Sequence, residues 1–195
     1  MPVFKIYDEH SLGFTHCGEV IAEGEGEVEL TDEEVQQLID LIRENDGETD
    51  VEELELEDVY PEIYETLDDA CRHAAYEAEY HHWIVEGYEN QYYDISTSEA
   101  IDKCKEYYGF VFEFDKEKFL EENPDYEEDE IDDDVIAEAE EEAFDQWVEE
   151  YRSTLNDHDE ALFLAEVFEL DPNIQDVDYE VVIPEGIVAM VEKQL

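Results

Sequence analysis

Carboxylates dominate this chain: 63 of its 195 residues are Asp or Glu, nine are Lys or Arg, and the formal charge is −54 at pH 7. A chain with so much charge of one sign is often disordered, because it has too little apolar surface to bury. This chain is 43% apolar and 12% aromatic, which suffices for a hydrophobic core. We therefore expect a folded protein whose carboxylates repel one another over a screening length of about 8 Å.

Hydrophobic periodicity predicts an α+β fold, in which a small antiparallel sheet of about four to five strands packs with two long acidic helices and several shorter ones. Gly24 and Gly26 are expected to form a hairpin turn between two of the strands. No linker divides the sequence, so residues 1–195 are expected to form one α+β domain, with a weak subdivision near 115–130. The candidate strands lie at 3–7, 20–22, 27–30, 91–95, 110–114 and 179–183.

Helix signals are clearest at Thr31-Asp32-Glu33-Glu34, a capping box that begins an amphipathic helix ending at Gly47. The two long helices are expected at 61–88, where Ala residues let a neighbour approach closely, and at 130–154. Shorter helices are expected at 51–57, from Ser96 to Gly109, after Asp115, at 159–170 and after Pro184.

The segment from Phe119 to Tyr151 contains 17 acidic residues and no basic one. Most runs of this kind are solvated helix faces. Two observations favour a functional role: a small domain needs a net charge of only about 2–8 for solubility, and the segment lacks the Lys residues that would form i,i+4 pairs. We therefore predict that carboxylates in the two acidic regions bind a partner in the positions of phosphates. They are Glu62, Glu65, Asp68, Asp69, Glu77, Glu79, Glu121, Glu122, Asp125, Glu127, Glu128, Asp129, Glu130, Asp132, Asp133, Asp134, Glu138, Glu140, Glu141 and Glu142.

Three aromatic residues, Tyr76, Tyr80 and Trp83, form a stripe on the predicted helix 61–88, opposite its Ala residues. Such stripes are usually part of a core. The alternative is a dimer seam or a partner hot spot, because Tyr and Trp are enriched in both.

Signals for catalysis or metal binding are weak. His73, Glu77 and His81 share one helix face and could bind zinc, but their spacing is not that of a metalloprotease, and residues 125–138 lack the order of a calcium loop. We find no phosphate-binding loop and no nucleophile motif. The sequence therefore predicts no enzyme, no catalytic residue, no metal site and no cofactor.

The cysteines Cys17, Cys71 and Cys104 are widely spaced and are expected to be reduced thiols. The N-terminus lacks a signal-peptide pattern, and no apolar stretch approaches the roughly 20 residues that span a bilayer. These observations predict a cytoplasmic protein without a membrane partner.

The acidic composition and the acidic helices resemble the DNA-mimic proteins of phages and mobile elements, such as anti-restriction and anti-CRISPR inhibitors. The resemblance implies an inhibitor in the host cytoplasm that occupies the basic cleft of a nuclease, a methyltransferase or a defence complex. The resemblance also implies a homodimer as one option. The negative charge itself predicts no direct binding to nucleic acid, because it repels phosphates. Two alternatives remain open: an acidic chaperone that sequesters basic proteins, and a protein of unrelated function adapted to high salt.

Overall fold

The computed structural model describes residues 1–15, 18–88, 95–124, 126–127, 130–172 and 174–193, without the side chains of 10–15 and 18–20. The chain divides into two compact units. Unit 1 comprises Met1–Asn90 and Pro172–Leu195, and unit 2 comprises Gln91–Asp171. The expected subdivision near 115–130 falls inside unit 2, and the expectation of one domain stays a prediction.

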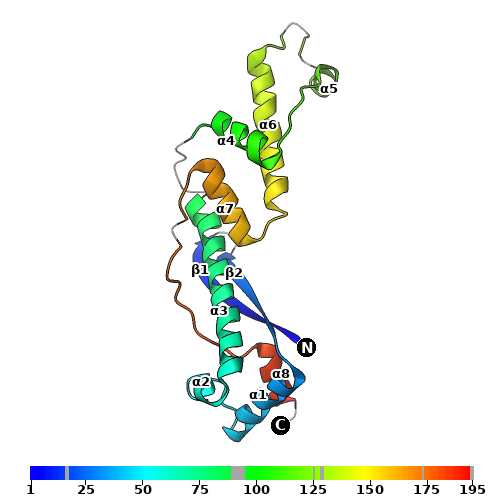
Figure 1. Cartoon of the computed structure of the whole chain (residues 1–195). Helices are drawn as coiled ribbons and strands as arrows, with labels where there is room; N and C mark the ends of the chain where they lie inside the picture. The colour runs from blue at the N-terminus through cyan, green and yellow to red at the C-terminus, as the bar shows by residue number, and fades with distance from the viewer. Residues whose placement is uncertain (16–17, 89–94, 125, 128–129, 173, 194–195) are drawn as a thin grey trace. The chain divides into compact units, whose positions relative to one another are not determined.

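Unit 1 contains an antiparallel hairpin and four α-helices within its described residues. The long helix α3 lies along one face of the hairpin (Figure 1). Phe4 pairs with Val28 and Ile6 with Gly26 on that covered face. The elements are β1 (Val3–Thr15), β2 (Gly18–Glu29), α1 (Asp32–Glu44), α2 (Leu56–Val59), α3 (Pro61–His82), the π-helical segment η1 (Trp83–Tyr88) and α8 (Glu185–Glu192).

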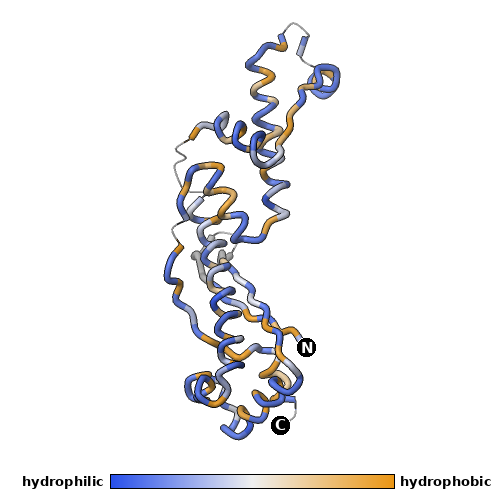
Figure 2. Tube along the Cα trace, in the orientation of Figure 1, coloured by the Kyte–Doolittle hydropathy of each residue, from blue (hydrophilic) through white to orange (hydrophobic). Residues whose placement is uncertain are grey.

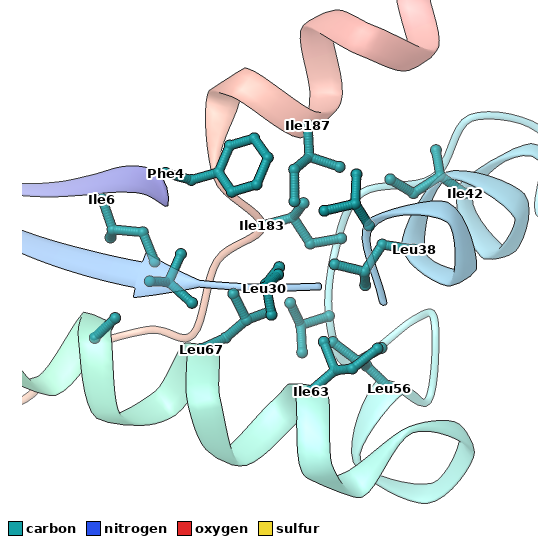
Figure 3. Packing of buried hydrophobic residues seen from close by; sticks show 14 of the residues in the cluster. Phe4, Ile6, Leu30, Leu38, Ile42, Leu56, Ile63, Leu67, Ile183 and Ile187 are labelled. Atoms are coloured by element: carbon teal, nitrogen blue, oxygen red, sulfur yellow. The ribbon is translucent and has the colours of Figure 1, made fainter. Parts of the chain in front are cut away.

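The core of unit 1 is largely aliphatic, although hydrophilic residues predominate along the chain (Figure 2). Side chains from β1, β2, α1, α3 and α8 meet in it, among them Ile6, Leu30, Leu38, Leu67 and Ile187 (Figure 3). Each fully buried side chain of this size stabilises the fold by about 1.5–3 kcal/mol. The predicted capping box is confirmed, because the Thr31 hydroxyl accepts from the Glu34 amide at 3.2 Å and the Thr31 amide donates to the Glu34 carboxylate at 2.6 Å.

The predicted hairpin turn at Gly24 and Gly26 is wrong, because both glycines lie inside β2 and face α3. A Cβ atom on Gly24 would lie 1.8 Å from the carbonyl oxygen of Ala74, and one on Gly26 would lie 2.1 Å from that of Ala70. Only glycine permits this approach of strand and helix backbones. The expected strands 20–22 and 27–30 are therefore one continuous strand, and the predicted role of the Ala residues in α3 is confirmed.

Unit 2 is helical throughout its described secondary structure. Ser96 and Asp115 cap α4 and α5, as the sequence predicts, and Asn156 caps α7. Aromatic rings fill much of the interior, including an edge-to-face pair of Phe110 and Phe144 with centroids 5.5 Å apart. The elements are α4 (Thr97–Lys103), the π-helical segment η2 (Cys104–Tyr108), α5 (Lys116–Glu122), α6 (Asp133–Arg152) and α7 (Asp157–Phe168).

The expected sheet of four to five strands is wrong: the described residues form one two-stranded sheet in a mostly helical protein. Segments 110–114 and 179–183 run as extended chain in Figure 1 but pair with no strand among the described residues. Phe110 packs on α6 instead, and the Tyr179 hydroxyl donates to Asp68 of α3 at 2.9 Å. Alternating apolar residues indicate that one face of a segment is buried. A packed helix can cover that face as well as a sheet can. Of the candidate strand 91–95, residues 91–94 lie outside the described residues.

The two long acidic helices are confirmed, as α3 with η1 and as α6. Within the described ranges, no helix is both long and apolar enough to cross a membrane.

Candidate functional site

One face of α6 carries an uninterrupted row of exposed carboxylates. Asp132 caps the N-terminus of this helix, because its Oδ1 accepts from the amides of Asp134 and Val135 at 3.2 and 3.1 Å. Phe144 and Val148 are buried and fix which face of α6 turns inward. Six acidic residues lie within about 100° of arc on the outer side, by the 3.6-residue period. We call them the α6 stripe: Asp134, Glu138, Glu141, Glu142, Asp145 and Glu149.

The carboxylates of the α6 stripe have no hydrogen-bond or ion-pair partner among the residues that the structure describes. Other acidic residues nearby do have internal partners. Glu140 pairs with Lys105 at 2.7 Å, and Glu150 accepts from Gln146 at 3.1 Å. The stripe is therefore negative charge that the described part of the protein does not neutralise.

The remaining predicted carboxylates of unit 2 lie before the stripe. Glu121 and Glu122 end α5, with Glu122 3.7 Å from Lys118. Glu130 accepts from the Glu127 amide at 2.8 Å, and Asp133 is the first residue of α6. Asp125, Glu128 and Asp129 lie outside the described residues.

The predicted carboxylates of unit 1 all lie on α3, and several have partners within that unit. Arg72 is close to Asp69 and 3.7 Å from Asp68, and Glu79 is 3.8 Å from His82. Because α3 and α6 belong to different units, we treat their carboxylates as two separate sets. The α3 residues of the prediction are Glu62, Glu65, Asp68, Asp69, Glu77 and Glu79.

A further row of carboxylates on β2 was missed by the sequence reasoning. Glu23, Glu25, Glu27 and Glu29 alternate with the residues that face α3, so they lie together on the uncovered face of the hairpin. Lys5 pairs with Glu25 at 2.5 Å, and this hydrogen bond raises the pKa of Lys5. The period-two spacing of these glutamates could have identified the row, had β2 been predicted as one strand.

The three aromatic residues singled out on α3 and η1 differ in exposure. Trp83 is buried, and its Nε1 has no hydrogen-bond partner among the described residues. Tyr76 and Tyr80 are half-buried. A role for these residues in an interface stays a prediction.

Neither a metal-binding group of side chains nor an exposed thiol is found within the described ranges. No group of three or more His, Cys, Asp or Glu side chains there could hold a metal ion. Cys71 and Cys104 are buried free thiols, and burial raises the pKa of both, that of Cys104 to about 11. Such thiols are poor nucleophiles near neutral pH. Cys17 lies outside the described residues.

Comparison with protein-family models, with curated proteins and with solved structures finds no match to this chain.

Proposed function

We propose that this protein is a DNA mimic that inhibits a nucleic-acid-binding protein by presenting the α6 stripe to its basic cleft. The supporting observation is the spacing of the stripe. Its six carboxylates span 15 residue steps, which at about 1.5 Å per residue is roughly 22 Å, or about one charge per 4 Å. One strand of duplex DNA carries a charge about every 3.4 Å of the axis.

The setting of these carboxylates suits the role. Lys and Arg side chains that bind phosphate oxygens also form charge-assisted hydrogen bonds with carboxylates, and Arg can do so with two parallel bonds. The stripe stands on a helix whose buried side carries Phe144 and Val148, so its charges are held in a fixed row before binding. Fixed rows of like charge accelerate encounter with an oppositely charged cleft, and this gain falls steeply with salt.

The two alternatives make different predictions about binding. An acidic chaperone would bind many basic proteins with similar affinity, and a protein adapted to high salt would bind none of them selectively. Both would depend on total charge, whereas a DNA mimic depends on where the charge lies.

A pair of charge-matched variants tests this difference. Glu138→Gln, Glu141→Gln and Asp145→Asn together remove three charges from the stripe, and Glu52→Gln, Glu53→Gln and Glu57→Gln together remove three exposed charges from unit 1. The native protein, immobilised and exposed to host lysate, is eluted with a salt gradient and with duplex DNA. We expect it to retain one or two DNA-handling proteins that duplex DNA releases.

The affinity of each retained protein is then measured against both variants. We expect the stripe variant to bind about tenfold more weakly and the unit 1 variant to bind within about threefold of native, because a specific row outweighs total charge. Equal weakening by both variants would refute the proposal, as would a broad set of basic proteins that duplex DNA fails to displace.

A further inference from the structure

Unit 2 contains an open groove of about 420 Å³ beside the α6 stripe. Four aromatic side chains line one side of it: Phe112, Phe114, Phe119 and Tyr126. Successive ring centroids are 6.5, 5.3 and 5.5 Å apart, so the rings form a continuous apolar surface. The segment that carries the first two rings is apolar in Figure 2 and leads into α5 in Figure 1.

The groove is open because α6 changes from large to small side chains along its length. Near its C-terminal end, Phe144 and Trp147 pack against Phe110 with ring centroids 5.5 and 5.4 Å away. Toward the N-terminal end, the helix presents Ala139 and Ala143 to the groove instead. Val135 and Gln146 of α6 also line the groove, but no ring of α6 pairs with Phe112 or Phe114 among the described residues, and both rings remain half-buried.

Carboxylates surround the apolar surface on two sides. Glu113, Asp115 and Glu122 line it from the extended segment and α5, and Glu138 and Glu142 line it from α6. Lys118, 3.7 Å from Glu122, is the basic residue among the described lining residues. Glu138 and Glu142 also belong to the α6 stripe, so the groove and the stripe form one continuous surface.

The combination of rings and carboxylates identifies the occupant by its chemistry. A helix with apolar side chains on one face and Lys or Arg beside them would bury its apolar side chains against the rings. Its cations would meet the carboxylate rim, and an Arg could also stack on a ring face. The phosphates of DNA supply a comparable row of negative charge but no apolar surface of this kind beside it.

We propose that this groove binds a cationic amphipathic helix of the partner protein. The inference rests on the proposed function in that the same partner contacts the α6 stripe. The stripe then supplies the attraction that any DNA-binding protein would feel, and the groove selects among such proteins.

Two synthetic peptides of equal length and equal positive charge test the groove directly. One places Leu and Trp along one face of an Arg-containing helix, and the other replaces these apolar residues with Ser. Each peptide carries a fluorescent label, and its affinity for the full chain is measured by anisotropy. We expect the amphipathic peptide to bind about tenfold more tightly than the Ser peptide, because apolar anchors carry much of the binding energy at interfaces.

Matched substitutions on α6 test whether the preference for the amphipathic peptide arises at the groove. Ala143→Trp fills the groove, whereas Ala137→Trp adds the same side chain at an exposed position that does not line it. We expect Ala143→Trp to reduce the preference to about threefold or less and Ala137→Trp to leave it unchanged. Circular dichroism and thermal unfolding verify the fold, and Phe114→Ser, which removes a ring from the floor, replaces any variant that fails to fold.

Equal binding of both peptides to the native chain would overturn the inference, and so would a preference that survives both Ala143→Trp and Phe114→Ser. A two-residue variant, Glu141→Gln with Asp145→Asn, removes stripe charges that do not line the groove. It should weaken the binding of both peptides alike and keep the ratio of their affinities. If the native chain prefers the amphipathic peptide but retains no DNA-handling protein from lysate, only the proposed DNA mimicry is refuted. If it retains such a protein but binds both peptides equally, only the proposed role of the groove is refuted.

Discussion

The two units carry similar amounts of charge over different interiors. Unit 1 has 33 acidic and four basic residues, and unit 2 has 30 acidic and five basic residues in a shorter stretch of chain. Unit 1 is closed by aliphatic side chains and by the contact of Gly24 and Gly26 with α3. Unit 2 is filled by aromatic rings, some of which remain half-buried along the groove.

This difference shows that net charge alone does not locate a binding surface in such a protein. Close contact of backbones fills the covered face of the hairpin in unit 1, and on the uncovered face Val3 and Tyr7 are exposed on either side of Lys5. Rings are larger and fit less completely around α6, so unit 2 keeps an apolar surface next to its unneutralised charge. If the proposed groove binds a partner, the interior of each unit decides which acidic surface recognises that partner by shape.

The largest effect expected is that of Gly24→Ala in unit 1. The new methyl group would overlap the carbonyl oxygen of Ala74, so the helix must move away from β2. We expect a loss of about 4 kcal/mol in the free energy of unfolding. Hydrogen exchange read by mass spectrometry should show faster exchange in β2 and α3 and unchanged exchange in α6.

Glu27→Ala, on the uncovered face of the same strand, is the control and should change stability by less than about 1 kcal/mol. Similar losses from Gly24→Ala and Glu27→Ala would mean that the backbone contact is not what closes unit 1.

A smaller effect is expected at alkaline pH, mainly in unit 2. Burial raises the pKa of Cys104 from 9.0 to about 11, so between these values the folded chain keeps a proton that the unfolded chain releases. The free energy of unfolding should therefore fall as pH rises through this window, by up to about 3 kcal/mol. Urea unfolding at a series of pH values measures the slope.

Cys104→Ala should flatten that slope, although it also lowers stability at neutral pH by leaving a cavity. Cys71→Ala in unit 1 should flatten it less, because the Val182 amide, 3.4 Å from the Cys71 sulfur, partly offsets the effect of burial on the Cys71 pKa. An unchanged slope in Cys104→Ala would contradict the attribution of this pH dependence to the raised pKa of Cys104.

The smallest effect concerns repulsion within the α6 stripe. Like charges at i,i+4 destabilise a helix by about 0.2–0.5 kcal/mol per pair, and the stripe contains several such pairs, including Glu138 with Glu142 and Asp145 with Glu149. The stripe variant described above should gain about 1 kcal/mol at low salt and less near 0.5 M NaCl, where the screening length is only about 4 Å.

The unit 1 variant with the same charge should gain less, since its three positions lie around the short helix α2 rather than in a long row. Equal gains in thermal unfolding would show that the arrangement of charge on α6 does not matter for stability.

Local features of the fold were predictable from sequence, and long-range ones were not. Thr31, Ser96 and Asp115 act through neighbouring amides, so their caps could be read from a few residues. Whether Phe110 or Tyr179 would pair with a strand or pack on a helix depends on distant chain, and the prediction failed there. Gly24 was assigned to a turn because glycine permits both a turn and a close backbone contact.

The site was predictable in kind but not in detail. The acidic run in the sequence identified α6 as the acidic helix. Only the structure shows that Glu140 pairs with Lys105, whereas Glu138 and Glu141 have no partner among the described residues. The groove depends on Ala139 and Ala143 lying opposite Phe112 and Phe114, a juxtaposition that sequence periodicity does not contain.

The contact between β2 and α3 also bears on how this sequence can evolve. Two glycines and a few alanines bring the hairpin and its helix together through backbone atoms, and the side chains of the glutamates on the opposite face are exposed and lie outside that backbone contact. Substitutions there can accumulate without repacking the interior. A lineage built on this scaffold can therefore redistribute its outward charge from generation to generation while its architecture stays the same.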